Sequence, residues 1–319
     1  MKPQIFQEIA DELERRVRTG AYARGSALPS RNHLVAEFKS SRVTVDRAIR
    51  VLVHRGILTS RHGSGTFVSG EDVKYRVAFI GANCDLQLDK LDVVQVSASR
   101  LAHRSEWSRL LEYSGVIFSM PEAALVPLVQ EIARTLPTVA VNRILPGVPY
   151  VSTDFRGAYR EITRERMAAC PQARVFFLRS MTRSLAISYR EEGFLDACRE
   201  AQKFYEIIDM PNEFEGRLEV LERALRPGGP MILVSDALNN TGSVMHYAMS
   251  HHLEWGRDIS YSDFDNDYPS DVWGVAVTSF LQDFRALHTK AAQMLLDYLE
   301  NGTRLERLNI PPLRRNGDT

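Results

Sequence analysis

Apolar residues recur every four positions near the start of the chain, and this spacing predicts an amphipathic helix. Its apolar stripe consists of Ile5, Ile9, Leu13 and Val17. Further along, Ser30 carries a side chain suited to capping a second, shorter helix. The buried side of that helix is expected to contain Leu34, Val35 and Phe38. The start of the chain therefore predicts two helices in succession.

A third helix is indicated by the spacing of apolar residues after Ser40 and Ser41, either of which is placed to cap it. The positions expected to face inward are Val45, Ala48, Ile49 and Leu52. The same geometry turns outward Arg42, Thr44, Arg47 and Arg50. Arginine bonds bidentately to guanine or pairs with phosphate, short hydroxyls suit phosphate oxygens, and Val43 is placed to touch a thymine methyl. This outward face is a candidate DNA-contacting surface.

Two short strands follow Gly56, at 57–61 and 66–68, with a basic, glycine-rich tip between them. His62 and Gly63 lie in that tip, where no bulky side chain blocks approach to a groove or a phosphate. Three helices followed by such a hairpin are typical of a winged helix-turn-helix, which places a helix in the major groove of DNA. We therefore expect residues 1–70 to form a winged helix-turn-helix domain.

From residue 75 onward, short runs rich in Val, Ile and Phe alternate with helical patterns. Strands are predicted at 76–81, 92–97, 115–120, 137–142, 174–179, 206–210, 231–236 and 258–262. Helices are predicted near 106–113, 121–135, 156–169, 188–202, 214–226, 238–251 and 283–300. This alternation indicates an α/β body over 75–319 with parallel sheets covered on both faces, and ligands on such sheets usually lie beyond the carboxyl ends of the strands.

Charge is distributed unevenly between these two parts of the chain. Residues 1–70 hold 12 Lys and Arg against 6 Asp and Glu, whereas the remainder holds 28 basic and 34 acidic residues, so the net charge of zero hides a basic head. A local excess of positive charge is the electrostatic signature of phosphate binding. The basic head and the helix pattern thus indicate the same partner, double-stranded DNA.

Composition places the protein among ordinary globular proteins, with 44% hydrophobic and 25% charged residues. No apolar run approaches the length needed to cross a membrane, and the N-terminus lacks the apolar core of a signal peptide. The cysteines, Cys84, Cys170 and Cys198, are odd in number and lack metal-ligand spacing. These features predict a cytoplasmic protein with reduced thiols and no membrane partner.

The head resembles the GntR family of bacterial transcription regulators over roughly residues 3–69. The matching pieces are LPSR at 28–31, SRVTV at 41–45, and RHGSGTFV at 61–68. The resemblance implies that DNA-contacting positions fall on Ser41, Arg42, Thr44, His62 and Gly63.

Two residues of the head depart from the family's pattern. Arg31 and Asn32 stand where family members usually have Glu-Arg, whose arginine contacts phosphate, so this contact is expected to be shifted or lost. Asp46 replaces an arginine that many members carry; it cannot hold a phosphate but can accept from cytosine N4. We expect an altered operator preference rather than a loss of DNA binding.

The body resembles the LacI-type effector domain, which is related to periplasmic sugar-binding proteins. The resemblance rests on the order of the segments LPTVAVNR, VSTD, SYREEGFLDA, ILVSDALNNTG and ISYSDFD between residues 136 and 265, and on PPLRRNGDT at the end. It implies two lobes with a cleft, a homodimer, and three crossings of the chain between lobes, near residues 153, 273 and 307.

Candidate effector-binding residues come from the same resemblance. Arg190 matches an arginine that grips sugar hydroxyls, Asp236 lies at the polar end of its strand, and Ser262 with Asp263 stands where an aspartate often binds sugar. Each has another interpretation, since Arg190 would serve equally as a surface ion-pair residue and Asp236 as a cap for the following helix. The first strand-helix unit also looks truncated, because about ten residues separate its strands.

These observations predict a sequence-specific repressor that binds a palindromic operator and is released by a small carbohydrate-like effector. The alternative is a DNA-binding regulator whose degenerate body only dimerises, or binds a protein or a molecule other than a sugar. An enzyme is not expected, because the chain has no nucleophile elbow, phosphate-binding loop or Rossmann glycine fingerprint. No cofactor or metal is expected either, since the pair His251-His252 lacks companions at ligand spacing.

Overall fold

A computed structural model describes residues 5–61, 65–70, 74–82, 86–181, 184–226 and 228–319. The chain divides into two compact units. Unit 1 comprises Met1–Ser152 and Phe284–Leu308, and unit 2 comprises Thr153–Asp283 and Asn309–Thr319. The chain passes between the units after residues 152, 283 and 308, so the middle passage comes later than the expected position near residue 273.

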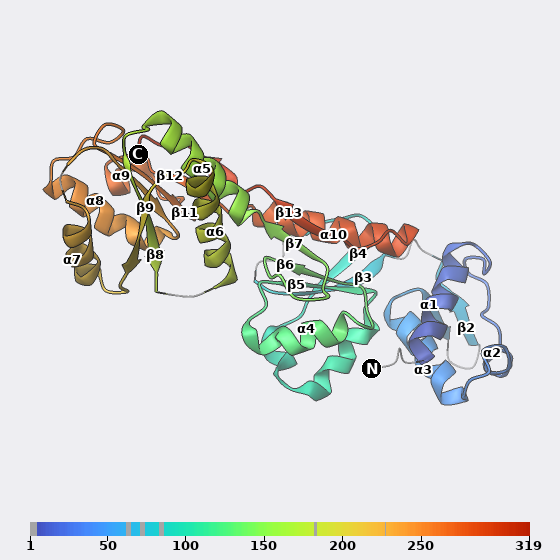
Figure 1. Ribbon diagram of the computed structural model, residues 1–319. Helices are drawn as coiled ribbons and strands as arrows, with labels where there is room; N and C mark the ends of the chain where they lie inside the picture. The colour runs from blue at the N-terminus through green and yellow to red at the C-terminus, as the bar shows by residue number, and fades with distance from the viewer. Residues whose placement is uncertain (1–4, 62–64, 71–73, 83–85, 182–183, 227) are drawn as a thin grey trace. The chain divides into compact units, whose positions relative to one another are not determined.

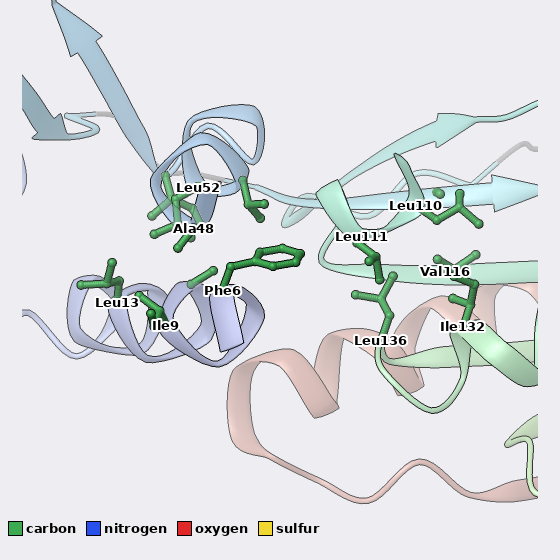
Figure 2. Packing of buried hydrophobic residues seen from close by; sticks show 14 of the residues in the cluster. Phe6, Ile9, Leu13, Ala48, Leu52, Leu110, Leu111, Val116, Ile132 and Leu136 are labelled. Atoms are coloured by element: carbon green, nitrogen blue, oxygen red, sulfur yellow. The ribbon is translucent and has the colours of Figure 1, made fainter. Parts of the chain in front are cut away.

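The head of unit 1 contains three helices and a two-stranded antiparallel hairpin (Figure 1). The elements are α1 Ile5–Arg18, α2 Arg31–Glu37, α3 Arg42–His54, β1 Leu58–Arg61 and β2 Gly65–Val68. Figure 2 shows Ile9 and Leu13 of α1 turned toward Ala48 and Leu52 of α3, and all four side chains are buried. The apolar residues at the predicted spacing therefore pack α1 against α3.

Unit 1 also contains a six-stranded sheet in the order β13-β7-β6-β5-β3-β4 (Figure 1). The strands are β3 Tyr75–Ile80, β4 Leu91–Gln95, β5 Gly115–Ser119, β6 Thr138–Val141, β7 Tyr150–Thr153 and β13 Arg307–Ile310. Neighbouring strands from β4 to β7 are parallel. The helices of this part are the 3-10 helices η1 Ala98–Ala102, η2 Arg104–Glu112 and η3 Ala123–Leu125, with α4 Val126–Ile132 and α10 Phe284–Asn301.

The helix predicted near 106–113 is a 3-10 helix rather than an α-helix. Trp107 and Leu110 stand three residues apart, a spacing that puts both side chains on one side of a 3-10 helix. The connection from β3 to β4 has no helix among its described residues, 81–82 and 86–90. The predicted truncation of the first strand-helix unit is thus present in the structure.

Unit 2 contains a second six-stranded sheet, in the order β14-β12-β11-β10-β8-β9 (Figure 1). The strands are β8 Arg174–Ser180, β9 Tyr205–Met210, β10 Met231–Ser235, β11 Ile259–Phe264, β12 Thr278–Leu281 and β14 Leu313–Arg315. All neighbours are parallel except β14, which runs antiparallel to β12. Its helices are α5 Phe155–Ala169, α6 Leu185–Glu200, α7 Phe214–Ala224, η4 Leu238–Asn240, α8 Thr241–Ser250 and α9 Ser270–Trp273.

The two faces of this second sheet carry separate hydrophobic cores, as alternation along buried parallel strands requires. Phe177 and Phe264 pack with residues of α5 and α6 on one face. Phe176 and Tyr261 pack with residues of α7 and α8 on the other. The predicted α/β class, a winged helix-turn-helix with a body of parallel sheets, is confirmed. No helix in the described ranges is long and apolar enough to cross a membrane.

Candidate functional site

Ser41 caps the N-terminus of α3, so of the two serines that the sequence offered, Ser40 and Ser41, the second forms the cap. Ser41 Oγ accepts a hydrogen bond from the Thr44 backbone N–H at 3.2 Å and lies 2.7 Å from Thr44 Oγ1. Two hydroxyl groups share one hydrogen bond here, so one hydroxyl proton remains to be donated elsewhere. The helix therefore begins with a donor and free backbone N–H groups, a combination that suits a phosphate oxygen.

The outward face of α3 presents the cationic side chains that the sequence predicted. Arg42, Arg47 and Arg50 are exposed, and Val43 is 74% exposed, an unusual degree for an apolar side chain in a folded head. Arg47 stacks over the ring of Phe6, with its guanidinium carbon 4.0 Å from the ring centroid. This surface of arginines around one apolar side chain fits phosphates and a thymine methyl.

The two residues of α2 that were predicted to contact DNA, Arg31 and Asn32, differ in exposure. Ser30 Oγ caps α2 by accepting from the His33 N–H at 3.3 Å, and Asn32 in its first turn is exposed. Arg31 is half-buried, and its guanidinium is bonded within the head, to Asp46 and Thr66. His62 and Gly63 of the wing tip lie outside the described residues.

In unit 2, Arg190 lies in the interior of the fold rather than on its surface. It is 7% exposed, and its guanidinium carbon sits 3.6 Å from the ring centroid of Phe264 and 4.8 Å from that of Phe155. Its Nη1 donates to the backbone carbonyl of Asp236 at 2.6 Å. The interpretation of Arg190 as a surface ion-pair residue is therefore wrong. Burial lowers the pKa of Arg190 from its ordinary value.

Asp236 follows β10 directly and is fully buried. Its carboxylate accepts from the Ser180 N–H at 2.8 Å and from Ser180 Oγ at 2.6 Å, so it links the carboxyl ends of β10 and β8. The alternative role as a helix cap is wrong, because neither η4 nor α8 has a side-chain cap. Burial raises the pKa of Asp236, and the hydrogen bonds from Ser180 oppose the rise.

Ser262 and Asp263 are both buried, but as adjacent residues of β11 they point to opposite faces of the sheet. Asp263 accepts from Thr241 Oγ1 of α8 at 2.5 Å and from Asn266 Nδ2 at 2.7 Å. Ser262 lies on the face of Phe264, and its Oγ has no hydrogen-bond partner among the described residues. The structure therefore brings Ser262 to the Arg190 side of the sheet and leaves Asp263 on the other.

Asp265 is a further polar residue at the same sheet edge, and it is not among the residues predicted from the sequence. It follows β11 with a φ of 60° and accepts from Gln282 N–H at 3.2 Å and Gln282 Nε2 at 2.5 Å. Burial raises its pKa, and the positive charge of Arg190 acts against that rise. Polar residues directly follow the buried strands β10, β11 and β12, and this repeated pattern is the signal in the sequence that indicates Asp265.

The remaining pair with a possible role in metal binding is His251-His252. His251 Nε2 lies 2.9 Å from a carboxylate oxygen of Glu222, an ordinary surface interaction. No group of three or more potential metal ligands occurs in the parts of the chain that the structure describes.

The head and the two sheets define a class of protein: a winged helix-turn-helix joined to a body of two parallel sheets. Residues 5–68 match the family described as "Bacterial regulatory proteins, gntR family", so the head is a GntR-type DNA-binding domain. One relative is the mannosyl-D-glycerate transport/metabolism system repressor MngR of Escherichia coli (strain K12), 42% identical over 73 residues. The match covers 23% of this chain and only 30% of that relative.

The body has the fold of LacI-family regulators. A LacI-family regulatory protein from Chloroflexus aggregans has a TM-score of 0.60 at 17% identity, over 75% of this chain and 96% of that chain. The transcriptional regulator CelR in complex with cellobiose has a TM-score of 0.56 at 16% identity, over 91% of this chain and 99% of that chain. The chain therefore joins a GntR-type head to a LacI-like body.

Proposed function

We propose that the protein is a transcriptional regulator that binds DNA sequence-specifically through α3 and the wing. The observation that carries this proposal is the exposed cationic face of a GntR-type recognition helix within a head of net positive charge. Arg42 and Arg47 are assigned to phosphate or guanine, Ser41 and Thr44 to phosphate, and Val43 to a thymine methyl. In the second helix and the wing, the assigned contacts are Asn32, His62 and Gly63.

The proposed active form is a cytoplasmic homodimer on a palindromic operator. A dimer of winged heads reads two half-sites whose spacing matches that of its recognition helices, so a small rotation between heads changes the affinity for DNA. The LacI-like body is the proposed dimerisation element of this arrangement. Repression is the proposed mode, by analogy with the described role of the E. coli relative.

We further propose a small carbohydrate-like effector at the carboxyl ends of the second sheet. The support is a buried arginine, Arg190, on the same side of the sheet as Ser262, whose hydroxyl lacks a partner among the described residues, together with the carboxylate of Asp265. Hydroxyl-rich ligands need such paired donors and acceptors. A regulator of similar fold was solved with cellobiose. Asp236 would shape this site from behind, by holding the strand ends together.

A second candidate function is a body that only dimerises or binds a partner other than a sugar. It is favoured by the fact that both carboxylate oxygens of Asp236 already accept hydrogen bonds from Ser180 within the fold. Buried carboxylates with complete partners have little capacity left for ligand hydroxyls. The two candidates share the DNA-binding head and differ only in the ligand of the body.

Fluorescence anisotropy with a labelled duplex, selected by the protein from a random pool, tests both proposals. The duplex is titrated at fixed salt, then again with a panel of mono- and disaccharides. Release by one sugar supports the effector proposal, and unchanged binding with all of them favours the second candidate. Arg42→Ala is expected to weaken binding, whereas Arg304→Ala, an exposed arginine far along the sequence from the head, is the matched control.

A further inference from the structure

Three elements of the head meet at the side chain of Arg31. This residue opens α2, and its Nη1 donates to Thr66 Oγ1 of the wing strand β2 at 2.8 Å. Its Nε donates to a carboxylate oxygen of Asp46 in α3 at 3.4 Å. Thr66 is only 3% exposed, so the guanidinium is anchored to a fixed point of the wing.

Asp46 occupies an unexpected position for a carboxylate. It lies between Arg42 and Arg50 at intervals of four residues, and such residues share one side of a helix. Arg50 donates to the Asp46 backbone carbonyl at 3.4 Å, which keeps the neighbouring arginine along the same side. A carboxylate in this row repels phosphate, and its pairing with Arg31 cancels one positive charge of the head.

We propose that Arg31 is a positioning residue for sequence reading and that it does not contact phosphate. The guanidinium holds the wing strand against the recognition helix, and Asp46 keeps it turned away from the DNA backbone. The pair thereby lowers the affinity for DNA of any sequence, but it fixes the geometry of α3 and the wing. That fixed geometry raises the preference for the correct sequence. This inference rests on the proposed DNA binding of the head.

The salt dependence of DNA binding separates positioning from phosphate contact. Affinity for DNA falls as salt rises, and each phosphate neutralised by a side chain makes the slope of log affinity against log salt concentration steeper by roughly 0.9; slope here means this steepness. An arginine that only positions the wing adds nothing to that slope. Removal of the Asp46 carboxylate frees the Nε edge of Arg31 for a phosphate, so the slope is expected to rise only while Arg31 is present.

The test uses the full-length protein and a duplex selected by the wild type from a random pool, with a scrambled duplex for comparison. Affinities are measured over a salt series for the wild type, Arg31→Ala, Asp46→Ala and the double variant. Arg42→Ala, a proposed direct contact, is the positive control and is expected to lower the slope by about 0.9. Arg31→Gln, which keeps a donor for Thr66, replaces Arg31→Ala if the latter fails to fold.

Arg31→Ala is expected to leave the slope unchanged and to lower the ratio of selected to scrambled affinity by about fivefold, the lower end of the effect of one mismatched base pair. Asp46→Ala is expected to raise the slope by about 0.9, and the double variant to return it to the wild-type value. A slope lowered by Arg31→Ala would overturn the proposal, as would a raised slope that persists in the double variant. Selection of no duplex at all would instead remove the proposed function on which the inference rests.

Discussion

Replacement of Arg55 by leucine is expected to destabilise the head far more than replacement of any exposed arginine. Arg55 is 4% exposed, and its Nη1 donates to Glu14 at 2.7 Å and to Asp11 at 3.3 Å. Its Nη2 donates to the backbone carbonyl of Tyr113 at 3.0 Å. Glu14 is itself only 8% exposed, so loss of Arg55 leaves this buried carboxylate paired only with the partly exposed Arg18, at 2.9 Å.

The size of the effect follows from this burial. Removal of one partner from a buried ion pair costs about 3–5 kcal/mol, because the other charge stays desolvated. Since Arg18 still pairs with Glu14, we expect the lower end of this range, about 3 kcal/mol. At 1.36 kcal/mol for each factor of ten, local opening of the head becomes roughly two orders of magnitude more frequent. An exposed pair behaves differently: the side chain of Arg15, beside Glu12, is 62% exposed, and screening by solvent leaves this pair little effect on stability.

Hydrogen–deuterium exchange of the α1 and α3 amides measures this opening within the head alone, without an assumption that the whole chain unfolds together. Arg55→Leu is expected to accelerate exchange there, with Arg15→Leu as the matched control. The double variant Arg55→Leu/Glu14→Leu is expected to recover most of the loss, since it removes both buried charges. Equal exchange in Arg55→Leu and Arg15→Leu would refute the reasoning.

Three further predictions concern unit 2. Arg190→Ala should lower the melting temperature of the body even without ligand, because it removes a charged hydrogen bond of about 1.5–3 kcal/mol together with stacking on Phe264; an unchanged temperature in a thermal scan would contradict its buried role. Gly193→Ala should prevent the close packing of α5 on α6, since a Cβ there would lie 2.2 Å from the Arg156 carbonyl oxygen. A soluble variant with an unchanged melting temperature in the same scan would contradict this close packing of the two helices. Burial raises the pKa of Asp263, so the folded state keeps this proton to higher pH than the unfolded state. The free energy of unfolding should therefore fall as pH rises from about 4 through the raised pKa. Asp263→Asn should flatten this part of the profile of stability against pH, and a profile identical to that of the wild type would contradict the raised pKa.

The helices of the head and their caps can be predicted from local sequence, whereas the bonds between side chains of different elements cannot. The caps are formed by bonds that reach three residues along the chain, so the sequence alone predicts Ser30 for α2 and limits the cap of α3 to Ser40 or Ser41, of which the structure has Ser41. The bonds of Arg31 with Asp46 and Thr66 join residues 15 and 35 positions apart, and no periodicity encodes such a contact. The sequence therefore predicted the contact surface but not which of its cations is already engaged.

In the body, too, the longer buried strands can be predicted from local sequence, whereas contacts between distant residues cannot. The buried parallel strands were predicted because their apolar runs are continuous. The apolar pattern does not predict the strands at 150–153, 278–281, 307–310 and 313–315, because they are only three or four residues long and the last two are partly exposed. Asp236 was chosen correctly as a polar strand end, but its partner Ser180 is 56 residues away and only the fold brings them together.

The central claim is that the basic head reads a specific DNA sequence. Selection from a random pool of duplexes, followed by sequencing, tests it most directly, with the full-length protein and Arg42→Ala in parallel. The account predicts enrichment of one motif with two inverted half-sites, and loss of that enrichment in Arg42→Ala. A pool that stays unenriched with the wild type, or an enriched motif that Arg42→Ala selects equally well, would contradict it.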